Sequence, residues 1–152
     1  MKVFILQGVS GSGKSTLANS LRGEICSADS FFIKDGKYQF DISKLSEAHG
    51  KCLKKFIDMV QNNIKLIVVD NTNTTIEEIA PYFAVAQAYN YDIEIISLHC
   101  PVEIAAKRNV HNVPKKSIEY MQERIINMRF PYYWKFIHTK YICGENGYES
   151  MI

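Results

Sequence analysis

The stretch Gly8-Val-Ser-Gly-Ser-Gly-Lys-Ser15 decides the fold of this chain of 152 residues. It satisfies the pattern G-x-x-x-x-G-K-[ST] and lies between the apolar run 2–7 and the helical pattern 14–21. Small residues let successive backbone N–H groups converge on phosphate oxygens, which a larger side chain would obstruct. A strand, this loop and a helix in succession predict a P-loop. The alternative, a glycine-rich turn that binds nothing, is disfavoured by the complete motif in this context.

The same motif predicts which residues bind ATP. We expect Lys14 to reach the β- and γ-phosphates and the Ser15 hydroxyl to bind Mg²⁺. The residues of this loop that are expected to bind ATP are Gly8, Ser10, Gly11, Ser12, Gly13, Lys14, Ser15 and Thr16.

Short β-branched runs alternate with longer segments of helical period along the chain. This alternation is typical of a parallel sheet that is covered by helices on both faces. We therefore predict a three-layer α/β fold of the P-loop NTPase and kinase type, as one domain over 1–152, with a central, mostly parallel, five-stranded sheet. The expected strands are Lys2 to Gln7, Glu24 to Ala28, Lys65 to Val69, Asp92 to Leu98 and Thr139 to Cys143.

Helix starts are indicated by capping residues and prolines. A long helix is expected from Ser43 to the asparagine pair 62–63. Thr74 and Glu77 have capping-box spacing, and Pro81 is expected to break the helix that follows. Pro101 and Pro114 are each expected at a first helical position.

Composition narrows the class of protein further. The chain is 47% apolar and 22% charged, it has no apolar run of membrane-spanning length, and its four cysteines form no zinc-ligand pattern. These features favour a cytoplasmic protein with reduced thiols that has no membrane partner. The segment 107–140 holds eight Lys or Arg and two Glu, a net charge of +6, which suits a polyanion.

Two carboxylates are expected at the carboxyl ends of strands, where ligands bind in this kind of fold. Asp29 follows one strand and Asp70 follows another. Either could accept a proton from an attacking hydroxyl or hold Mg²⁺ through water. A turn or cap role is an equal alternative for Asp29, whereas an acid ending an apolar strand favours function for Asp70. Asn71, Thr72 and Asn73 could cap the next helix or contact a substrate.

Together these motifs resemble the P-loop 5′-hydroxyl polynucleotide kinases of the phage and bacterial RNA-repair type, and still more the kinase-like module of the Nedd-four-binding proteins. The resemblance covers most of the chain. Its matching pieces are Gly8 to Thr16, Ser27 to Phe32, Asp35 to Asp41, Glu47 to His49, Asp70 to Asn73 and Lys107 to His111.

The resemblance implies a role for each matching residue. Asp29 corresponds to the family's general base, and Asp70 and Thr72 to the segment that lines the acceptor; we expect Asn73 beside them. Arg108 corresponds to an arginine of a helical lid that reaches over the ATP phosphates. On physical grounds alone, a solvated helix end is the favoured interpretation of Arg108, because cationic residues are stabilising there.

The implied activity is transfer of the γ-phosphoryl group of ATP to a 5′-hydroxyl of RNA or DNA, on a single-stranded end. Phage-type members carry an arginine three residues after the base, where this chain has Phe32. Lys34 or Lys37 could supply that charge as a point charge. The departure keeps two alternatives open: a nucleoside or other small-molecule kinase, and an ATP-binding interaction module with little turnover.

The aromatic segment 131–134 lies among cations, a composition that is used to stack bases. Packing of the segment over the sheet is the favoured alternative, because bulky aromatics are more often core residues. Phe31 and Phe32 are expected to form an apolar wall beside the acceptor.

Overall fold

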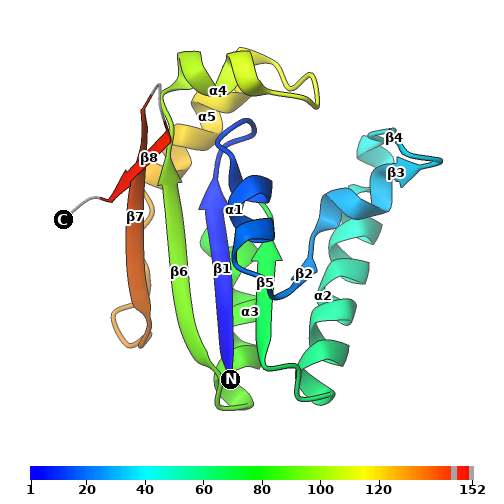
Figure 1. Ribbon diagram of the computed structural model, residues 1–152, viewed down its shortest axis with the longest axis vertical. Coiled ribbons are helices and arrows are strands. Elements are labelled where there is room, and N and C mark those ends of the chain that lie inside the picture. The colour runs from blue at the N-terminus through cyan, green and yellow to red at the C-terminus, as the bar shows by residue number, and fades with distance from the viewer. Residues whose placement is uncertain (145–146, 151–152) are drawn as a thin grey trace.

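The computed structural model describes residues 1–144 and 147–150, which form strands and helices in alternation (Figure 1). In chain order the elements are β1 (Lys2–Gly8), α1 (Lys14–Ser20), β2 (Glu24–Cys26), the 3₁₀ helix η1 (Ala28–Phe32), β3 (Ile33–Lys34), β4 (Lys37–Tyr38), the 3₁₀ helix η2 (Ile42–Lys44), α2 (Leu45–Gln61), β5 (Leu66–Asp70), α3 (Ile76–Ala88), β6 (Asp92–His99), α4 (Val102–Arg108), α5 (Lys115–Ile126), β7 (Ile137–Gly144) and β8 (Gly147–Ser150). No helix within this described part of the chain combines the length and the apolar character that a bilayer span requires.

The main sheet has the strand order β2-β5-β1-β6-β7-β8. Its first five strands are parallel, so that Ile5 of β1 lies between Val69 of β5 and Ile95 of β6. These five strands confirm the predicted parallel sheet. The antiparallel edge strand β8 was not predicted, because Gly147–Ser150 is short and contains no β-branched residue.

Alternate side chains of the sheet pack into two separate apolar layers, as the period of two requires. Val3 and Ile5 lie in the cluster that contains Phe56 of α2 and Phe83 of α3. Leu6 lies in the cluster that contains Ala18 of α1, on the other face of the sheet. The sheet is therefore the middle layer of a three-layer fold, as predicted (Figure 1).

A third apolar cluster joins the helices α4 and α5 to the loop after β1. It contains Val9 of that loop, Ala105 of α4 and Ile118 and Ile125 of α5, all buried. Figure 1 shows α4 lying across the carboxyl end of the sheet, in the place expected for a helical lid. The start of each helix differs by one residue from the prediction, since Pro101 and Pro114 are the N-cap residues and not the first helical residues.

The start of α3 also differs from the prediction. Thr75, not Thr74, is the N-cap, and its hydroxyl accepts a hydrogen bond from the Glu78 backbone N–H at 3.3 Å. Pro81 does not break the helix, which continues to Ala88. A proline in the second turn removes one backbone hydrogen bond, and the buried residues on either side, Ile79 and Phe83, keep the helix on the sheet.

A tight hairpin, β3 and β4, follows η1. Its two-residue turn is Asp35-Gly36, with φ values of +52° and +75°, the backbone that Asp-Gly adopts in hairpins of this length. The register places Ile33 opposite Tyr38 and Lys34 opposite Lys37. The hairpin therefore carries Tyr38 back toward η1, which contains Asp29.

Candidate active site

The loop between β1 and α1 depends on two glycines with left-handed backbone. Gly11 has φ +83°, and Gly13, the N-cap of α1, has φ +91°. A Cβ on Gly11 would lie 2.1 Å from the backbone oxygen of Ala105 in α4. Glycine is therefore required both by the dihedral angle and by the close approach of α4 to the loop.

Lys14 is almost completely buried beneath this loop. The side chain is 9% exposed, and its Nζ donates a hydrogen bond to the Val9 carbonyl oxygen at 3.1 Å. Burial lowers the pKa of Lys14, while the nearby Asp70 and, more weakly, Asp29 favour its charged form. An anion in the loop would supply further compensation for this ammonium, as phosphate oxygens do in P-loops.

Asp70 ends β5 beside the first turn of α1. Its Oδ2 accepts a hydrogen bond from the Ser15 hydroxyl at 2.9 Å. Burial raises the pKa of Asp70, and the charge of Lys14 and the Ser15 hydrogen bond only partly offset this. A hydroxyl and a carboxylate next to a phosphate site are the oxygen ligands that Mg²⁺ uses, directly or through water, so Ser15 and Asp70 fit the ion that the motif implies.

Asp29 lies in η1 and is exposed. Its Oδ1 accepts a hydrogen bond from the Tyr38 hydroxyl at 3.2 Å. Burial and the neighbouring Asp29 carboxylate raise the pKa of Tyr38 to about 12, so this tyrosine keeps its proton at neutral pH. Asp29 also interacts electrostatically with Lys14 and Asp70. The structure therefore brings together the lysine and both carboxylates that the sequence singled out.

Asn71 positions η1, a role that differs from the helix cap or substrate contact expected of it from the sequence. Its Oδ1 accepts a hydrogen bond from the Ala28 backbone N–H at 2.8 Å, and its Nδ2 lies 3.6 Å from Cys52 Sγ of α2. Ala28 directly precedes Asp29 in the chain. One buried amide thus links the end of β5, the start of η1 and α2. The sequence signal for this role is the position of Asn71, a polar residue directly after Asp70, the carboxylate that ends a strand.

The two remaining acceptor candidates lie deeper in the fold. The Thr72 carbonyl accepts a hydrogen bond from the Gly8 backbone N–H at 3.1 Å, and the residue is half-buried. Asn73 is 1% exposed, and its Nδ2 donates to the Leu6 carbonyl at 2.7 Å. Asn73 therefore anchors its loop to β1, and the structure does not bring its side chain to the open part of the site.

The three other polar residues of the loop differ in exposure. Ser10 is half-buried, Ser12 is fully buried, and Thr16 is exposed in the first turn of α1. Among the residues that the structure describes, the Ser12 hydroxyl has no hydrogen-bond partner. It lies below the backbone of the loop, within 2.7 Å of where a Cβ on Gly8 would be.

The structure does not join Arg108 to the loop. Arg108 is exposed at the end of α4, and its Nη1 donates to Cys143 Sγ of β7 at 3.0 Å. The segment after α4 instead contacts the site through His111, whose ring centroid lies 4.0 Å from that of Tyr38. The lid therefore touches the tyrosine that is hydrogen-bonded to Asp29. Neither Tyr38 nor His111 was singled out as a site residue from the sequence.

The aromatic residues divide into core and surface. Phe32 is 3% exposed and packs on Phe40 at 5.1 Å between ring centroids, so it belongs to the core and not to an open wall. Trp134 stacks on Phe83 at 4.0 Å, which confirms packing for this part of the aromatic segment. Tyr132 is 98% exposed.

Fold and loop define a kinase-like P-loop nucleotide-binding domain. A family model described as an AAA domain matches residues 3–129, and the chain belongs to this family. The chain is 36% identical to human NEDD4-binding protein 2 over 159 residues, which cover 98% of this chain and 8% of that protein. It is 31% identical over 109 residues to the bifunctional polynucleotide phosphatase/kinase of Schizosaccharomyces pombe, covering 72% of this chain and 24% of the relative. The chain thus spans less than a quarter of the length of either relative.

A solved structure shows the same fold. A chain of the Pnkp1/Rnl/Hen1 RNA repair complex matches with a TM-score of 0.67 at 22% sequence identity, covering 82% of this chain and 44% of that one.

Proposed function

We propose that this chain is an ATP-dependent kinase that transfers the γ-phosphoryl group to the 5′-hydroxyl of a polynucleotide. The observation that carries the proposal is the exposed Asp29 carboxylate, which accepts a hydrogen bond from the Tyr38 hydroxyl and interacts electrostatically with the Lys14 ammonium. A carboxylate that is open to solvent can accept the proton of an incoming hydroxyl. The polynucleotide phosphatase/kinase relative supports the choice of acceptor.

In the proposed reaction, an Asp29 carboxylate oxygen takes the proton of the acceptor hydroxyl. The acceptor oxygen forms a bond to the γ-phosphorus as the bond from that phosphorus to the bridging oxygen of ADP breaks, and ADP leaves with the electron pair. The loop N–H groups and Lys14 hold the phosphates throughout. Ser15 and Asp70 would hold Mg²⁺, which when bound would neutralise negative charge on the phosphates. Arg108 would stabilise the transferring group only after its guanidinium leaves Cys143.

A small-molecule kinase is the second candidate, and the position of Phe32 favours it. Phe32 occupies the position of the phosphate-binding arginine in phage-type kinases, and it is buried in the core. Cations near η1 include the hairpin residues Lys34 and Lys37, both exposed and paired across the turn, and Lys51 of α2, whose Nζ lies 5.8 Å from the ring centroid of Phe31. These lysines would make few phosphate contacts, and a nucleoside acceptor would need none.

Transfer from γ-labelled ATP to a nucleoside, a 3′-mononucleotide and a short 5′-hydroxyl oligonucleotide tests the proposal. We expect the oligonucleotide to have the highest kcat/KM, with an advantage that falls as salt rises, because phosphate contacts release counterions. The double variant Lys34→Gln/Lys37→Gln should reduce this advantage. Lys65→Gln, an exposed lysine next to the amino end of β5, is the control. A nucleoside that equals the oligonucleotide at low salt would establish the small-molecule alternative, and ATP binding without any transfer would establish an interaction module.

The role of Asp29 is tested by Asp29→Asn in single-turnover transfer. We expect a rate at least ~100-fold below the parent with ATP affinity unchanged, the usual scale for loss of a positioned base. Asp35→Asn is the matched control, because Asp35 is exposed in the adjoining hairpin and asparagine tolerates its left-handed backbone. Equal rates for the two variants would remove Asp29 from the mechanism.

A further inference from the structure

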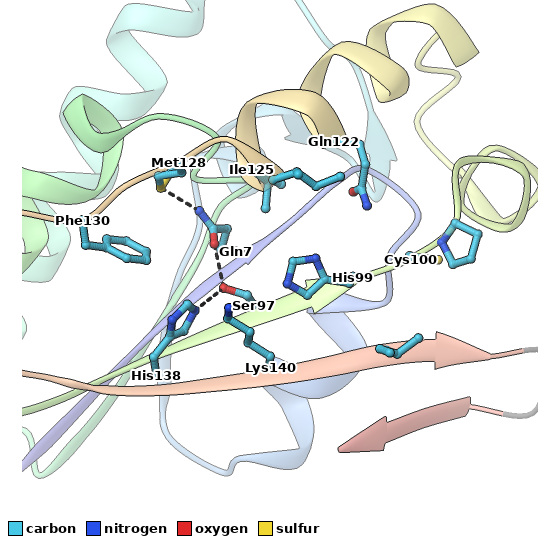
Figure 2. Close-up of a pocket in the computed structure, with 13 residues that line it drawn as sticks. Gln7, Ser97, His99, Cys100, Gln122, Ile125, Met128, Phe130, His138 and Lys140 are labelled. Atoms are coloured by element: carbon cyan, nitrogen blue, oxygen red, sulfur yellow. Dashed lines mark hydrogen bonds between the residues drawn. The ribbon is translucent and has the colours of Figure 1, made fainter. Parts of the chain in front are cut away.

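A second cleft lies on the face of the sheet that is covered by α5, between that helix and the strands β6 and β7 (Figure 2). Its volume is about 520 Å³, in the size range of small-molecule sites. The floor includes Gln7 and Ser97, which are 2% and 1% exposed. Gln7 shares its face of β1 with Val3 and Ile5, so the sheet separates this cleft from α1. The cleft therefore does not belong to the nucleotide site.

A hydrogen-bonded chain fixes the polar floor of the cleft. The Asn73 carbonyl accepts from Gln7 Nε2 at 3.0 Å, which orients the Gln7 amide so that its Oε1 accepts from the Ser97 hydroxyl at 2.7 Å. Because the Ser97 proton is used in this way, the hydroxyl oxygen must accept from His138 Nε2, which lies 2.8 Å away. Figure 2 shows this chain running from Gln7 to His138. The His138 ring is therefore held in one orientation whether it is neutral or protonated.

The side chains around the cleft give it positive character. His99, His138 and Lys140 line it, and no carboxylate does so among residues 1–144. Burial lowers the pKa of both His99 and His138, and the charge of Lys140 lowers each further. An anion in the cleft would counter these effects and favour protonated imidazoles.

One wall holds a polar atom without a partner. Gln122 Oε1 of α5 is buried, and it accepts no hydrogen bond from residues 1–144 or 147–150. Leaving a buried acceptor unpaired costs about 1–3 kcal/mol, so the Gln122 amide would gain by turning toward the cleft to accept a hydrogen bond from a bound donor. Ile125 and Phe130 form apolar parts of the lining. The cleft thus combines the Lys140 ammonium, two imidazoles that an anion would help to protonate, one acceptor without a partner, and apolar surface.

We propose that this cleft binds a small hydroxylated organic anion, a carboxylate or a phosphate monoester. Lys140 and the two imidazoles receive the anionic group, Gln122 Oε1 accepts a hydrogen bond from a ligand hydroxyl, and the carbon skeleton lies against Ile125 and Phe130. The rim is open to solvent, since His138 and Lys140 are exposed, so the ligand can enter without movement of the backbone. This site is independent of the proposed kinase activity.

Titration with lactate, ribose 5-phosphate and inorganic phosphate tests the proposal, with the imidazole NMR signals and calorimetry as readouts. We expect one hydroxylated probe to bind with 1:1 stoichiometry and a Kd below about 1 mM, and to shift the His99 and His138 signals. Comparison of lactate with ribose 5-phosphate distinguishes a carboxylate from a phosphate site. A saturating, non-hydrolysable Mg-ATP analogue should leave this binding unchanged.

Three variants locate the binding. Lys140→Gln should weaken binding of the hydroxylated probe by about tenfold or more, the scale of one charge-assisted hydrogen bond. Gln122→Leu should weaken the hydroxylated probe and leave inorganic phosphate unaffected. Lys135→Gln is the control, because Lys135 is an exposed lysine that precedes β7 and does not line the cleft. The proposal would be overturned if no probe shifted the histidine signals at a concentration of about 20 mM, roughly 20 times the highest expected Kd. It would also be overturned if Lys140→Gln bound the probe as tightly as the parent, or if the ATP analogue displaced the probe.

Discussion

Lys14 and Asp70 are both ionisable residues whose charged forms are disfavoured by the fold. Burial is the largest cause for each, lowering the pKa of Lys14 and raising that of Asp70. Their mutual attraction offsets only part of this effect. The ligand-free site is therefore less stable than a neutral pair of the same shape would be, and Mg²⁺ with a polyphosphate supplies the missing charges.

Asp70→Asn is expected to raise the free energy of unfolding at pH 7. A carboxyl whose folded pKa lies above its unfolded value stabilises the fold at low pH, and this contribution is lost as the pH rises through the folded pKa. Asparagine stays neutral and can still accept the Ser15 hydrogen bond. The gain should therefore shrink as the pH falls toward the ordinary aspartate value of about 3.9.

Urea unfolding of both proteins at pH 7 and pH 5 measures this gain. In transfer assays Asp70→Asn should need roughly 10–100 times more Mg²⁺, the scale reported for loss of groups that order a metal site. A variant less stable than the parent at pH 7 would contradict the argument from burial.

Tyr38→Phe is expected to lower kcat about tenfold while KM for ATP stays unchanged. The variant removes the hydroxyl that donates to Asp29 and keeps the ring contacts with Phe32 and His111. A hydrogen bond to a charged group contributes about 1.5–3 kcal/mol. Steady-state kinetics provide the measurement, with Tyr133→Phe, an exposed tyrosine outside the site, as the control. An unchanged kcat would show that Tyr38 does not position the carboxylate.

Site residues that belong to a local motif or that end a predicted strand could be predicted from the sequence. Site residues that reach the site only through contacts between segments far apart in the chain could not. The loop glycines, Lys14 and Asp70 are in the places expected of them. Tyr38 reaches Asp29 only because the Asp-Gly turn folds the chain back. His111 reaches Tyr38 from more than 70 positions away along the chain, which no local pattern encodes.

At the scale of the elements, α4 packs so closely on the phosphate loop that residue 11 must be glycine. The backbone oxygen of Ala105 lies 2.1 Å from where a Cβ on Gly11 would be, and a backbone oxygen cannot turn aside as the end of a side chain could. The phosphate loop and the lid are therefore packed as one unit. Movement of α4 would change the space available in the loop.

Gly11→Ala is expected to destabilise the protein by roughly 1–3 kcal/mol more than Gly36→Ala does, and to abolish ATP binding. Both glycines have positive φ, so both variants carry the same kind of backbone strain. Of these two glycines Gly11 adds a clash, because no atom of the described part of the chain lies within 4 Å of a Cβ on Gly36. Urea unfolding and binding of a fluorescent ATP analogue measure the two effects. If both variants lost the same free energy of unfolding, α4 would be able to move away from residue 11 at little cost.

Local ambiguity explains the errors at the level of elements. Thr74 with Glu77 and Thr75 with Glu78 both satisfy the capping-box spacing, and the packing of α3 on the sheet selects the second pair. The same packing keeps Pro81 inside the helix. Periodic apolar patterns predicted the strands and the long helix, since burial of a continuous face imposes those patterns.

At the scale of the whole molecule, binding of Mg-ATP should raise the free energy of unfolding. At an ATP concentration 100 times Kd, the native state gains about 2.7 kcal/mol. For a domain of this size we expect a rise in Tm of roughly 5–10 °C in the parent. Lys14→Ala should fold normally, since it removes a buried charge, and should show little shift. Thermal melts with and without Mg-ATP decide this, and equal shifts would exclude Lys14 from phosphate binding.

The order of strands also has a consequence for synthesis on the ribosome. The central strand β1 precedes both of its neighbours in the chain, β5 and β6, and the latter ends at His99. At a translation rate of 5–20 residues per second, the 91 positions from Gly8 to His99 take about 5–20 s. The edge of β1 that pairs with β5 stays free only until Asp70 has been made, whereas the edge that pairs with β6 keeps its backbone N–H and C=O groups unpaired for the whole interval and can pair with other nascent chains. Holdase chaperones that bind Val3 to Leu6 would therefore raise the yield of native protein, and slower translation between β1 and β6 would lower it.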